Sequence, residues 1–144
     1  MTQREEVFDS PTGWVADHIR DYVETGGRNG HLWRGVPTLL LTTRGRRTGK
    51  LRRSALIYGR SSDAFVLVAS KGGARHHPLW YLNLEANPVV EIQVGPDVIK
   101  GRARDATDAE RPEMWRTMTG LWPAYDDYQT KTSRRIPVVV IEPD

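Results

Sequence analysis

Six short apolar runs, separated by turns rather than by long helices, constrain the fold of this chain more than any other feature of its sequence. They lie at residues 38–43, 53–58, 64–70, 89–94, 98–105 and 136–143. Their aliphatic and β-branched residues are typical of strands. Parallel pairing needs long, usually helical crossovers, which most of these intervals lack. The sequence therefore predicts a mainly β protein with flanking helices, built as an antiparallel barrel.

Three segments with helical patterns flank these runs. The first, residues 11–25, has Pro11 at its first position and ends before a pair of glycines, as helices commonly do. Its apolar residues form one stripe, so we expect this helix either to pack on its own domain or to lie on a membrane surface. Two further helices are expected at 78–88 and 107–122, the second opened by a Thr-x-x-Glu capping pattern.

Length and composition limit the kinds of protein that this chain can be. Its 144 residues suffice for one core, so we expect a single domain spanning 1–144. The sequence contains no cysteine, which excludes thiolate chemistry and fits a reducing compartment. No apolar run approaches the roughly 20 residues that cross a bilayer, and the N-terminus lacks the apolar segment of a signal peptide. We expect a cytoplasmic protein, with a peripheral contact of the first helix on the inner face of the plasma membrane as the alternative.

The segment RGRRTGKLRR, residues 44–53, carries six cations in ten positions. Gly45 and Gly49 interrupt the run, and a charge run that only meets solvent has no need of glycine. The backbone N–H groups, the arginines and the Thr48 hydroxyl can together face one compact phosphate. The loop does not match the P-loop, which places Lys-Ser/Thr ahead of a helix. We interpret it as a site for a cofactor phosphate, with nucleic-acid phosphates as the alternative.

Three other segments carry candidate functional residues. ASKGG, residues 69–73, ends a predicted strand and adds a cation and exposed backbone N–H groups. HHPLWYLNL, residues 76–84, has adjacent histidines that cannot form an i, i+4 metal pair, so we expect no metal site. In LWPAYDDYQTKT, residues 121–132, three large aromatic residues fall three positions apart and form either a core plug or the wall of a pocket. No catalytic triad order, well-spaced carboxylate pair or GxGxxG turn is present.

Together, these segments resemble the deazaflavin-dependent nitroreductase family of actinobacteria, in the same order and spacing from about residue 35 to the end of the chain. The resemblance rests on LLLTTRGRRTGKLRR, VASKGG, HPLWYLNLEANP, RARDATDAER and WPAYDDYQ. It implies a split β-barrel of the FMN-binding split-barrel type that binds coenzyme F420. This cofactor is an 8-hydroxy-5-deazaflavin that bears a phosphate and an oligoglutamate tail, so one of its ends is strongly anionic.

The resemblance also implies roles for individual residues. Those implied to bind the cofactor are Gly45, Arg46, Arg47, Thr48, Gly49, Lys50, Arg52, Ser54, Ala69, Ser70, Lys71, Gly72, Pro78, Trp80 and Asn83. Within this set Lys50 and Arg52, together with Arg53, would attract the tail. Those implied to bind the substrate are Trp122, Tyr125 and Tyr128. We expect two catalytic residues: Ser70 or Tyr125 would hydrogen-bond the acceptor oxygen, and Tyr125 would relay a proton.

The implied activity is that of an F420H2-dependent oxidoreductase that passes a hydride from the reduced deazaflavin to a quinone or a nitroaromatic acceptor. Trp122 and Ile57 stand where the nitroimidazole-reducing member has tyrosines, which argues against that particular substrate. Two alternatives remain: a split-barrel reductase that binds FMN, and a basic barrel that binds nucleic acid. The cations in both loops favour the deazaflavin, so we expect a small-molecule acceptor and no nucleic-acid partner.

Overall fold

The computed structural model describes residues 5–10 and 13–144, without the side chains of Gly13 and Trp14. The strands are β1 (Val7–Asp9), β2 (Leu32–Trp33), β3 (Val36–Arg44), β4 (Leu51–Ile57), β5 (Gly59–Ser61), β6 (Ala64–Val68), β7 (Val89–Val94), β8 (Asp97–Asp105) and β9 (Val138–Pro143). The helices are α1 (Gly13–Thr25), the short 3₁₀ turn η1 (Lys71–Gly73), α2 (Leu79–Ala86), α3 (Arg111–Leu121) and α4 (Ala124–Thr130).

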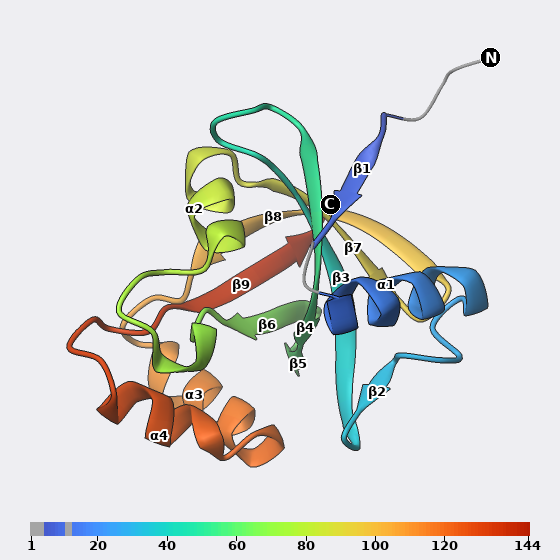
Figure 1. Ribbon diagram of the computed structural model, residues 1–144. Coiled ribbons are helices and arrows are strands. Elements are labelled where there is room, and N and C mark those ends of the chain that lie inside the picture. The colour runs from blue at the N-terminus through green and yellow to red at the C-terminus, as the bar shows by residue number, and fades with distance from the viewer. Residues whose placement is uncertain (1–4, 11–12) are drawn as a thin grey trace.

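The strands of the described ranges join in one sheet. Its order is β1-β4-β3-β7-β8-β9-β6-β5, with β2 paired to β3. Tyr58 alone separates β4 from β5 in the chain, yet the two strands lie near opposite ends of this order, so the sheet curls round on itself (Figure 1). Within the part of the chain that the structure covers, no ladder joins the two ends, and the barrel is not closed. The prediction of a mainly β fold with flanking helices is confirmed.

The structure corrects three details of the predicted elements. β1, β2 and β5 are absent from the prediction because two or three residues are too short to show an alternating pattern. β1 runs parallel to β4, so the sheet is not wholly antiparallel. Residues 124–130 form the helix α4, whereas the sequence suggested only an aromatic segment after a helix.

Helix α3 begins later than its capping pattern suggests. The capping pair forms as expected, since the Glu110 N–H donates to Thr107 Oγ1 at 3.2 Å and the Thr107 N–H donates to Glu110 Oε1 at 2.9 Å. Residues 108–110 nevertheless form a turn, and the helix starts at Arg111. Pro112 then lies in the first turn, where its missing N–H would have had no partner within the helix.

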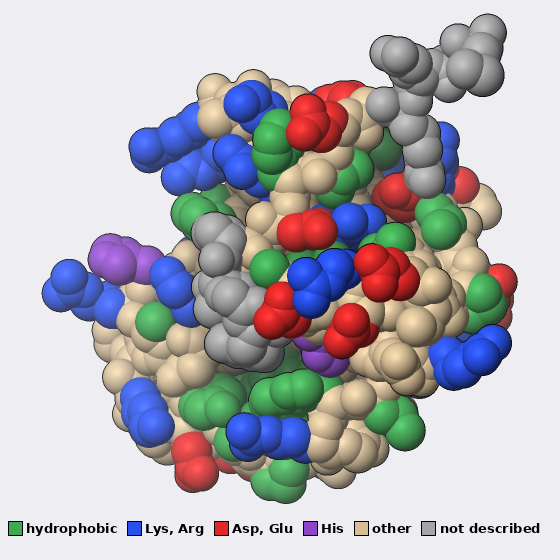
Figure 2. All heavy atoms as spheres, turned by 45° about the vertical axis from the view of Figure 1, so that its right-hand side comes forward, with side chains coloured by type: hydrophobic (Ala, Val, Ile, Leu, Met, Phe, Trp, Pro, Cys, Tyr) green, Lys and Arg blue, Asp and Glu red, His purple; other side chains and the backbone are tan. Residues whose placement is uncertain are grey.

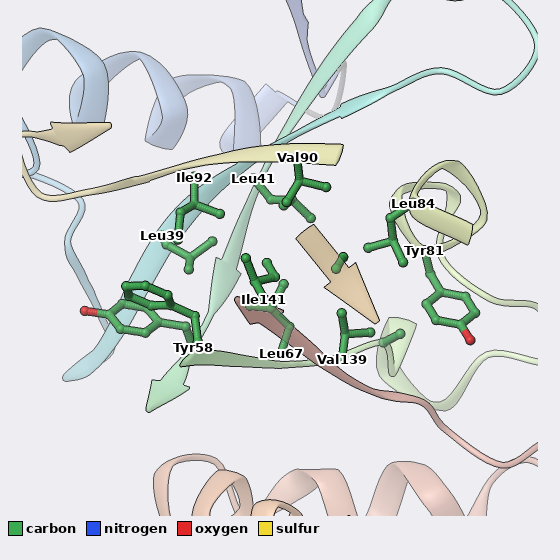
Figure 3. Packing of buried hydrophobic residues seen from close by; sticks show 13 residues of the cluster. Leu39, Leu41, Tyr58, Leu67, Tyr81, Leu84, Val90, Ile92, Val139 and Ile141 are labelled. Carbon is green, nitrogen blue, oxygen red and sulfur yellow. The ribbon is translucent and has the colours of Figure 1, made fainter. Parts of the chain in front are cut away.

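β6 and β9 are buried on both faces, which explains why their sequences are continuously apolar. On one face, Leu67 and Ile141 point into the barrel core with side chains of β3 and β7 (Figure 3). On the other face, Val66 and Val140 pack in a second core with Met114 and Met118 of α3. Because successive strand residues point to opposite faces, the paired strands β6 and β9 form the wall between two cores.

Helix α1 uses its apolar stripe within the protein. Ile19 and Tyr22 are fully buried and pack on Leu40 of β3, where α1 crosses the sheet (Figure 1). Of the two expectations for this helix, packing on the domain therefore accounts for the stripe, and the stripe gives no support for membrane contact. Pro11 and the Trp14 side chain lie outside the described residues. Across the described ranges, none of the helices has the length and apolarity needed to span a membrane.

The Tyr22 hydroxyl joins α1 to two separate parts of the sheet. It accepts a hydrogen bond from the Gly95 N–H at 2.7 Å. It donates a hydrogen bond to the Thr38 carbonyl at 3.1 Å. Burial raises the pKa of Tyr22, so the hydroxyl stays protonated. The sequence pattern marks Tyr22 only as an apolar position and does not reveal these contacts.

We expect Tyr22→Phe to lower the free energy of unfolding by about 1–3 kcal/mol, because the Gly95 N–H loses its partner. Urea denaturation measures this change. The matched control is Tyr58→Phe, because Tyr58 is similarly buried and its hydroxyl makes no hydrogen bond within the described ranges. Equal losses in the two variants would show that the Tyr22 hydrogen bonds contribute nothing beyond ring packing.

Candidate functional site

The loop between β3 and β4 is closed by its own backbone. The Gly45 N–H donates to the Lys50 carbonyl at 2.7 Å, and the Gly49 N–H donates to the Gly45 carbonyl at 2.8 Å. Thr48 Oγ1 accepts from the Lys50 N–H at 3.2 Å. A Cβ at Gly45 would lie 2.9 Å from Thr48 Oγ1, and Gly49 has φ +71°. Both glycines are therefore needed for this compact shape.

The cations of this loop point outward. Arg46, Arg47, Lys50 and Arg52 are exposed, and none of them forms an ion pair with a carboxylate of the described residues. Figure 2 shows Lys and Arg side chains gathered at the end of the molecule that the β3–β4 loop occupies in Figure 1. Lys50 and Arg52 lie over the ring of Phe8, at 5.0 and 5.4 Å from its centroid. The loop thus presents uncompensated positive charge of the kind that binds an anion.

The N-terminal arm, residues 5–9, compensates two neighbouring cations. The Asp9 carboxylate accepts from Arg53 Nε at 2.6 Å and from Arg53 Nη2 at 3.1 Å. The Glu5 carboxylate pairs with Arg44, whose guanidinium lowers the pKa of Glu5. Arg53 was expected to attract an anionic tail together with its neighbours, but its charge is already balanced inside the protein.

Asn83 of α2 fastens the loop to the helix. Its Oδ1 accepts from the Arg46 N–H at 3.1 Å, and its Nδ2 donates to Thr43 Oγ1 at 3.2 Å. The side chain is 7% exposed. Because both ends of the amide are engaged, Asn83 holds the loop in place, and its direct contact with a cofactor stays a prediction.

The other predicted residues of this region lie beside the loop and α2. Pro78 precedes α2, and its carbonyl accepts from the Tyr81 N–H at 3.1 Å. Trp80 is half-buried and packs against the barrel core. Ser54 is half-buried on β4, opposite Leu41 of β3. The Tyr81 hydroxyl donates to the Asp105 carboxylate at 2.9 Å, which ties α2 to β8.

The ASKGG turn follows β6 and meets α4. Ala69 is buried, and its N–H donates to the Pro137 carbonyl at 3.0 Å, which prolongs the pairing of β6 with β9. Ser70 is 7% exposed, and its hydroxyl makes no hydrogen bond within the ranges described. A Cβ at Gly73 would lie 2.7 Å from the Tyr128 carbonyl. The backbone of this turn therefore packs directly on the helix that carries the predicted substrate residues.

Tyr125 packs its ring in the second core. Its side chain is 5% exposed and packs in the second core, with its ring 6.4 Å from that of Trp115. Its hydroxyl has no hydrogen-bond partner among the described residues. The oxygen is not fully buried, because no fully buried side-chain oxygen in these ranges lacks a partner. Burial, and secondarily Tyr128, raise the pKa of Tyr125. The group thus stays protonated at neutral pH and can donate a hydrogen bond.

Trp122 and Tyr128 contact each other, and Trp122 also contacts Trp33, a residue that the sequence did not single out. Trp122 Nε1 donates to the Tyr128 hydroxyl at 3.3 Å. The Trp122 ring also lies 5.1 Å from the ring of Trp33 on β2, and Arg34 lies over Trp33. No local pattern connects Trp33 to a segment so far along the chain, so sequence reasoning missed this contact.

Arg134 is the second residue that sequence reasoning missed. It precedes β9 in the segment SRRIP, where nothing distinguishes it from the neighbouring Arg135. In the structure its guanidinium donates to the Ala69 and Ser70 carbonyls at the start of the ASKGG turn and to the Ala74 carbonyl just after it. Asn83 of α2 thus contacts the basic loop, Arg134 contacts both the ASKGG turn and His77 just before α2, and the turn packs on α4.

Two surface hollows lie apart from these residues. A hollow of about 900 Å³ is lined by the end of α1, residues 26–32 and the β7–β8 turn. One of about 300 Å³ lies beside β1 and contains Glu5 and Arg44. Neither contains a residue predicted to bind cofactor or substrate, so the candidate site rests on the chemistry of its loops. No cluster of three or more potential metal ligands occurs in the portion of the chain that the structure describes.

Comparison with known proteins identifies close relatives. Residues 14–143 match the profile of the F420H(2)-dependent quinone reductase family. The chain is 43% identical over 128 residues to an F420H(2)-dependent quinone reductase of Mycobacterium tuberculosis, covering 86% of each chain. A solved F420-H2 dependent reductase is 41% identical, with a TM-score of 0.68, over 74% of this chain and 94% of that one. A structure described as a domain-swapped dimer is 39% identical, with a TM-score of 0.71, over 92% and 100%.

The contacts of Asn83 generate a prediction for the basic loop. We expect Asn83→Ala to speed hydrogen exchange of the Arg46 amide by about tenfold or more, because that N–H loses its acceptor. Hydrogen–deuterium exchange measures this rate. The control is Asn87→Ala, because Asn87 accepts only from the exposed Val89 N–H just after the same helix. Equal exchange of the Arg46 amide in both variants would contradict an anchoring role for Asn83.

Proposed function

Because the chain belongs to the F420H(2)-dependent quinone reductase family, we propose that it is an oxidoreductase that uses reduced coenzyme F420 to reduce a quinone of the menaquinone type. The observation that carries this proposal is the closed β3–β4 loop with its uncompensated cations. A nitroaromatic compound is the alternative acceptor, since it is also flat and electron-poor.

The residues present fit the anionic end of coenzyme F420. The phosphate would bind the guanidinium groups of Arg46 and Arg47 and the backbone N–H and hydroxyl of Thr48, since the Arg46 N–H already donates to Asn83. Lys50 and Arg52 would attract the glutamate tail. Arg53 is left out of this proposal because Asp9 already neutralises it. The turn beginning at Ser70 and the helix α2 would flank the ring.

The protein's own residues would bind and orient the acceptor, while the bound reduced cofactor supplies the hydride. The Ser70 and Tyr125 hydroxyls have no hydrogen-bond partners among the residues that the structure describes, so each can donate to an acceptor oxygen as negative charge develops there. The raised pKa of Tyr125 favours hydrogen-bond donation over full proton release at neutral pH. Trp122 and Tyr128 would form the wall against which a flat acceptor lies.

The cofactor assignment is tested by titrating the protein with F420 and with FMN while following tryptophan fluorescence. We expect binding of F420 and at least about tenfold weaker binding of FMN, which lacks the glutamate tail. Arg47→Ala should weaken F420 binding by about 1.5–3 kcal/mol, the range for a charge-assisted hydrogen bond. Arg60→Ala is the control, because Arg60 is also exposed but lies on β5. Equal affinity for both cofactors, or salt-sensitive binding of oligonucleotides instead, would contradict the assignment.

The role of the Tyr125 hydroxyl is tested by Tyr125→Phe, which keeps the buried ring. We expect turnover of menaquinone to fall by about 10- to 100-fold with the F420 dissociation constant nearly unchanged, as for loss of an oriented donor. Steady-state kinetics and fluorescence titration measure the two quantities. Parent turnover in Tyr125→Phe would mean that Tyr125 contributes packing alone and donates no hydrogen bond that speeds turnover.

A further inference from the structure

The Arg134 guanidinium hydrogen-bonds mainly to backbone carbonyls. Its Nε donates to the Ala74 carbonyl at 2.8 Å, its Nη2 to the Ser70 carbonyl at 2.6 Å and its Nη1 to the Ala69 carbonyl at 3.1 Å. Nη1 also lies 3.0 Å from His77 Nδ1. Arg134 forms no ion pair with a carboxylate in the ranges that the structure describes. Withdrawing a cation from water costs free energy. The four contacts therefore indicate that Arg134 has a structural role in this region.

The segment held by Arg134 has an unfavourable backbone. Lys71, Gly72 and Gly73 have successive φ values of 46°, 62° and 82°, all in the left-handed region. Lysine adopts this region at a cost in energy, and such a conformation persists only where its surroundings enforce it. Arg134 bonds the backbone just before this run and just after it, so one planar group clamps both ends of the turn.

The same guanidinium also connects the turn to the segment just before α2, through its contact with His77. His77 immediately precedes Pro78, and its ring lies 4.8 Å from that of Tyr81 within α2. The pairing of β6 with β9 puts the end of one strand beside the start of the other, which is why Arg134 reaches residues about 65 positions away.

We propose that Arg134 is a positioning residue that sets the direction of the Ser70 hydroxyl and of the backbone of the turn toward the bound cofactor and acceptor. This inference rests on the proposed function. Arg134 itself touches neither ligand. It acts through the backbone of the ASKGG turn, and the planar fork of arginine is what lets one side chain serve three carbonyls.

The first test requires no cofactor. Arg134→Lys keeps the charge but loses the fork, and we expect the amides of residues 70–74 to exchange hydrogen at least about tenfold faster. Arg135→Lys is the matched control, because Arg135 is exposed and pairs with Asp108 at 3.0 Å. Unchanged exchange in Arg134→Lys would overturn the proposal. If both Arg134→Lys and Arg134→Gln fail to fold, Arg134 supports the whole fold and the proposal is wrong.

The second test is a double-mutant cycle with Ser70→Ala, read as turnover of menaquinone with F420. Arg134→Lys should lower turnover by about tenfold or more in the parent but by less than about threefold in Ser70→Ala, where the positioned hydroxyl is already absent. Additive losses, or parent turnover in Arg134→Lys despite faster exchange, would overturn the proposal. Failure of the proposed function is distinguishable, because the unaltered protein would then neither bind F420 nor reduce menaquinone.

Discussion

Burial of β6 and β9 on both faces is the constraint from which most of this structure follows. Leu67 and Ile141 fill the barrel, while Val66 and Val140 hold α3 on the outside. Full burial of such a side chain contributes roughly 1.5–3 kcal/mol, so the register between the two strands is strongly defined. That register in turn brings the turn after β6 beside the segment before β9 and thereby assembles one part of the candidate site.

The hydrogen bonds that position the basic loop do not involve the charged groups of Arg46 and Arg47. The basic loop is closed by backbone hydrogen bonds and anchored by the neutral amide of Asn83. The ASKGG turn is held by Arg134 through carbonyl oxygens alone. Arg46 and Arg47 therefore keep their charge for a ligand. The loop is therefore ordered before a ligand binds. Binding then loses less conformational entropy, which is the advantage of preorganisation.

Long periodic segments could be predicted from the sequence, and short or mixed ones could not. The strand at 89–94 was placed with its observed bounds, because alternation over six residues is informative. Strands of two or three residues are too short to show alternating hydrophobicity. In α4, the aromatic residues and the preceding proline form a pattern that is equally typical of a loop. In the site, the contiguous motifs identified the basic loop and the ASKGG turn, while Arg134 and Trp33 were missed because their partners lie far away in sequence.

By itself the sequence determined the mainly β architecture, the concentration of positive charge between β3 and β4, and the motif order that marks the family. The tertiary structure alone decided which cations remain available. Arg53 is neutralised by Asp9, 44 residues away, whereas Arg47 pairs with no carboxylate of the described ranges. It also decided that the Tyr125 ring lies in the second core while its hydroxyl has no hydrogen-bond partner among the described residues. The physical reason is that pairing of charges and exposure of single atoms depend on strand register and helix docking, which are sums of many distant contacts and leave no local pattern.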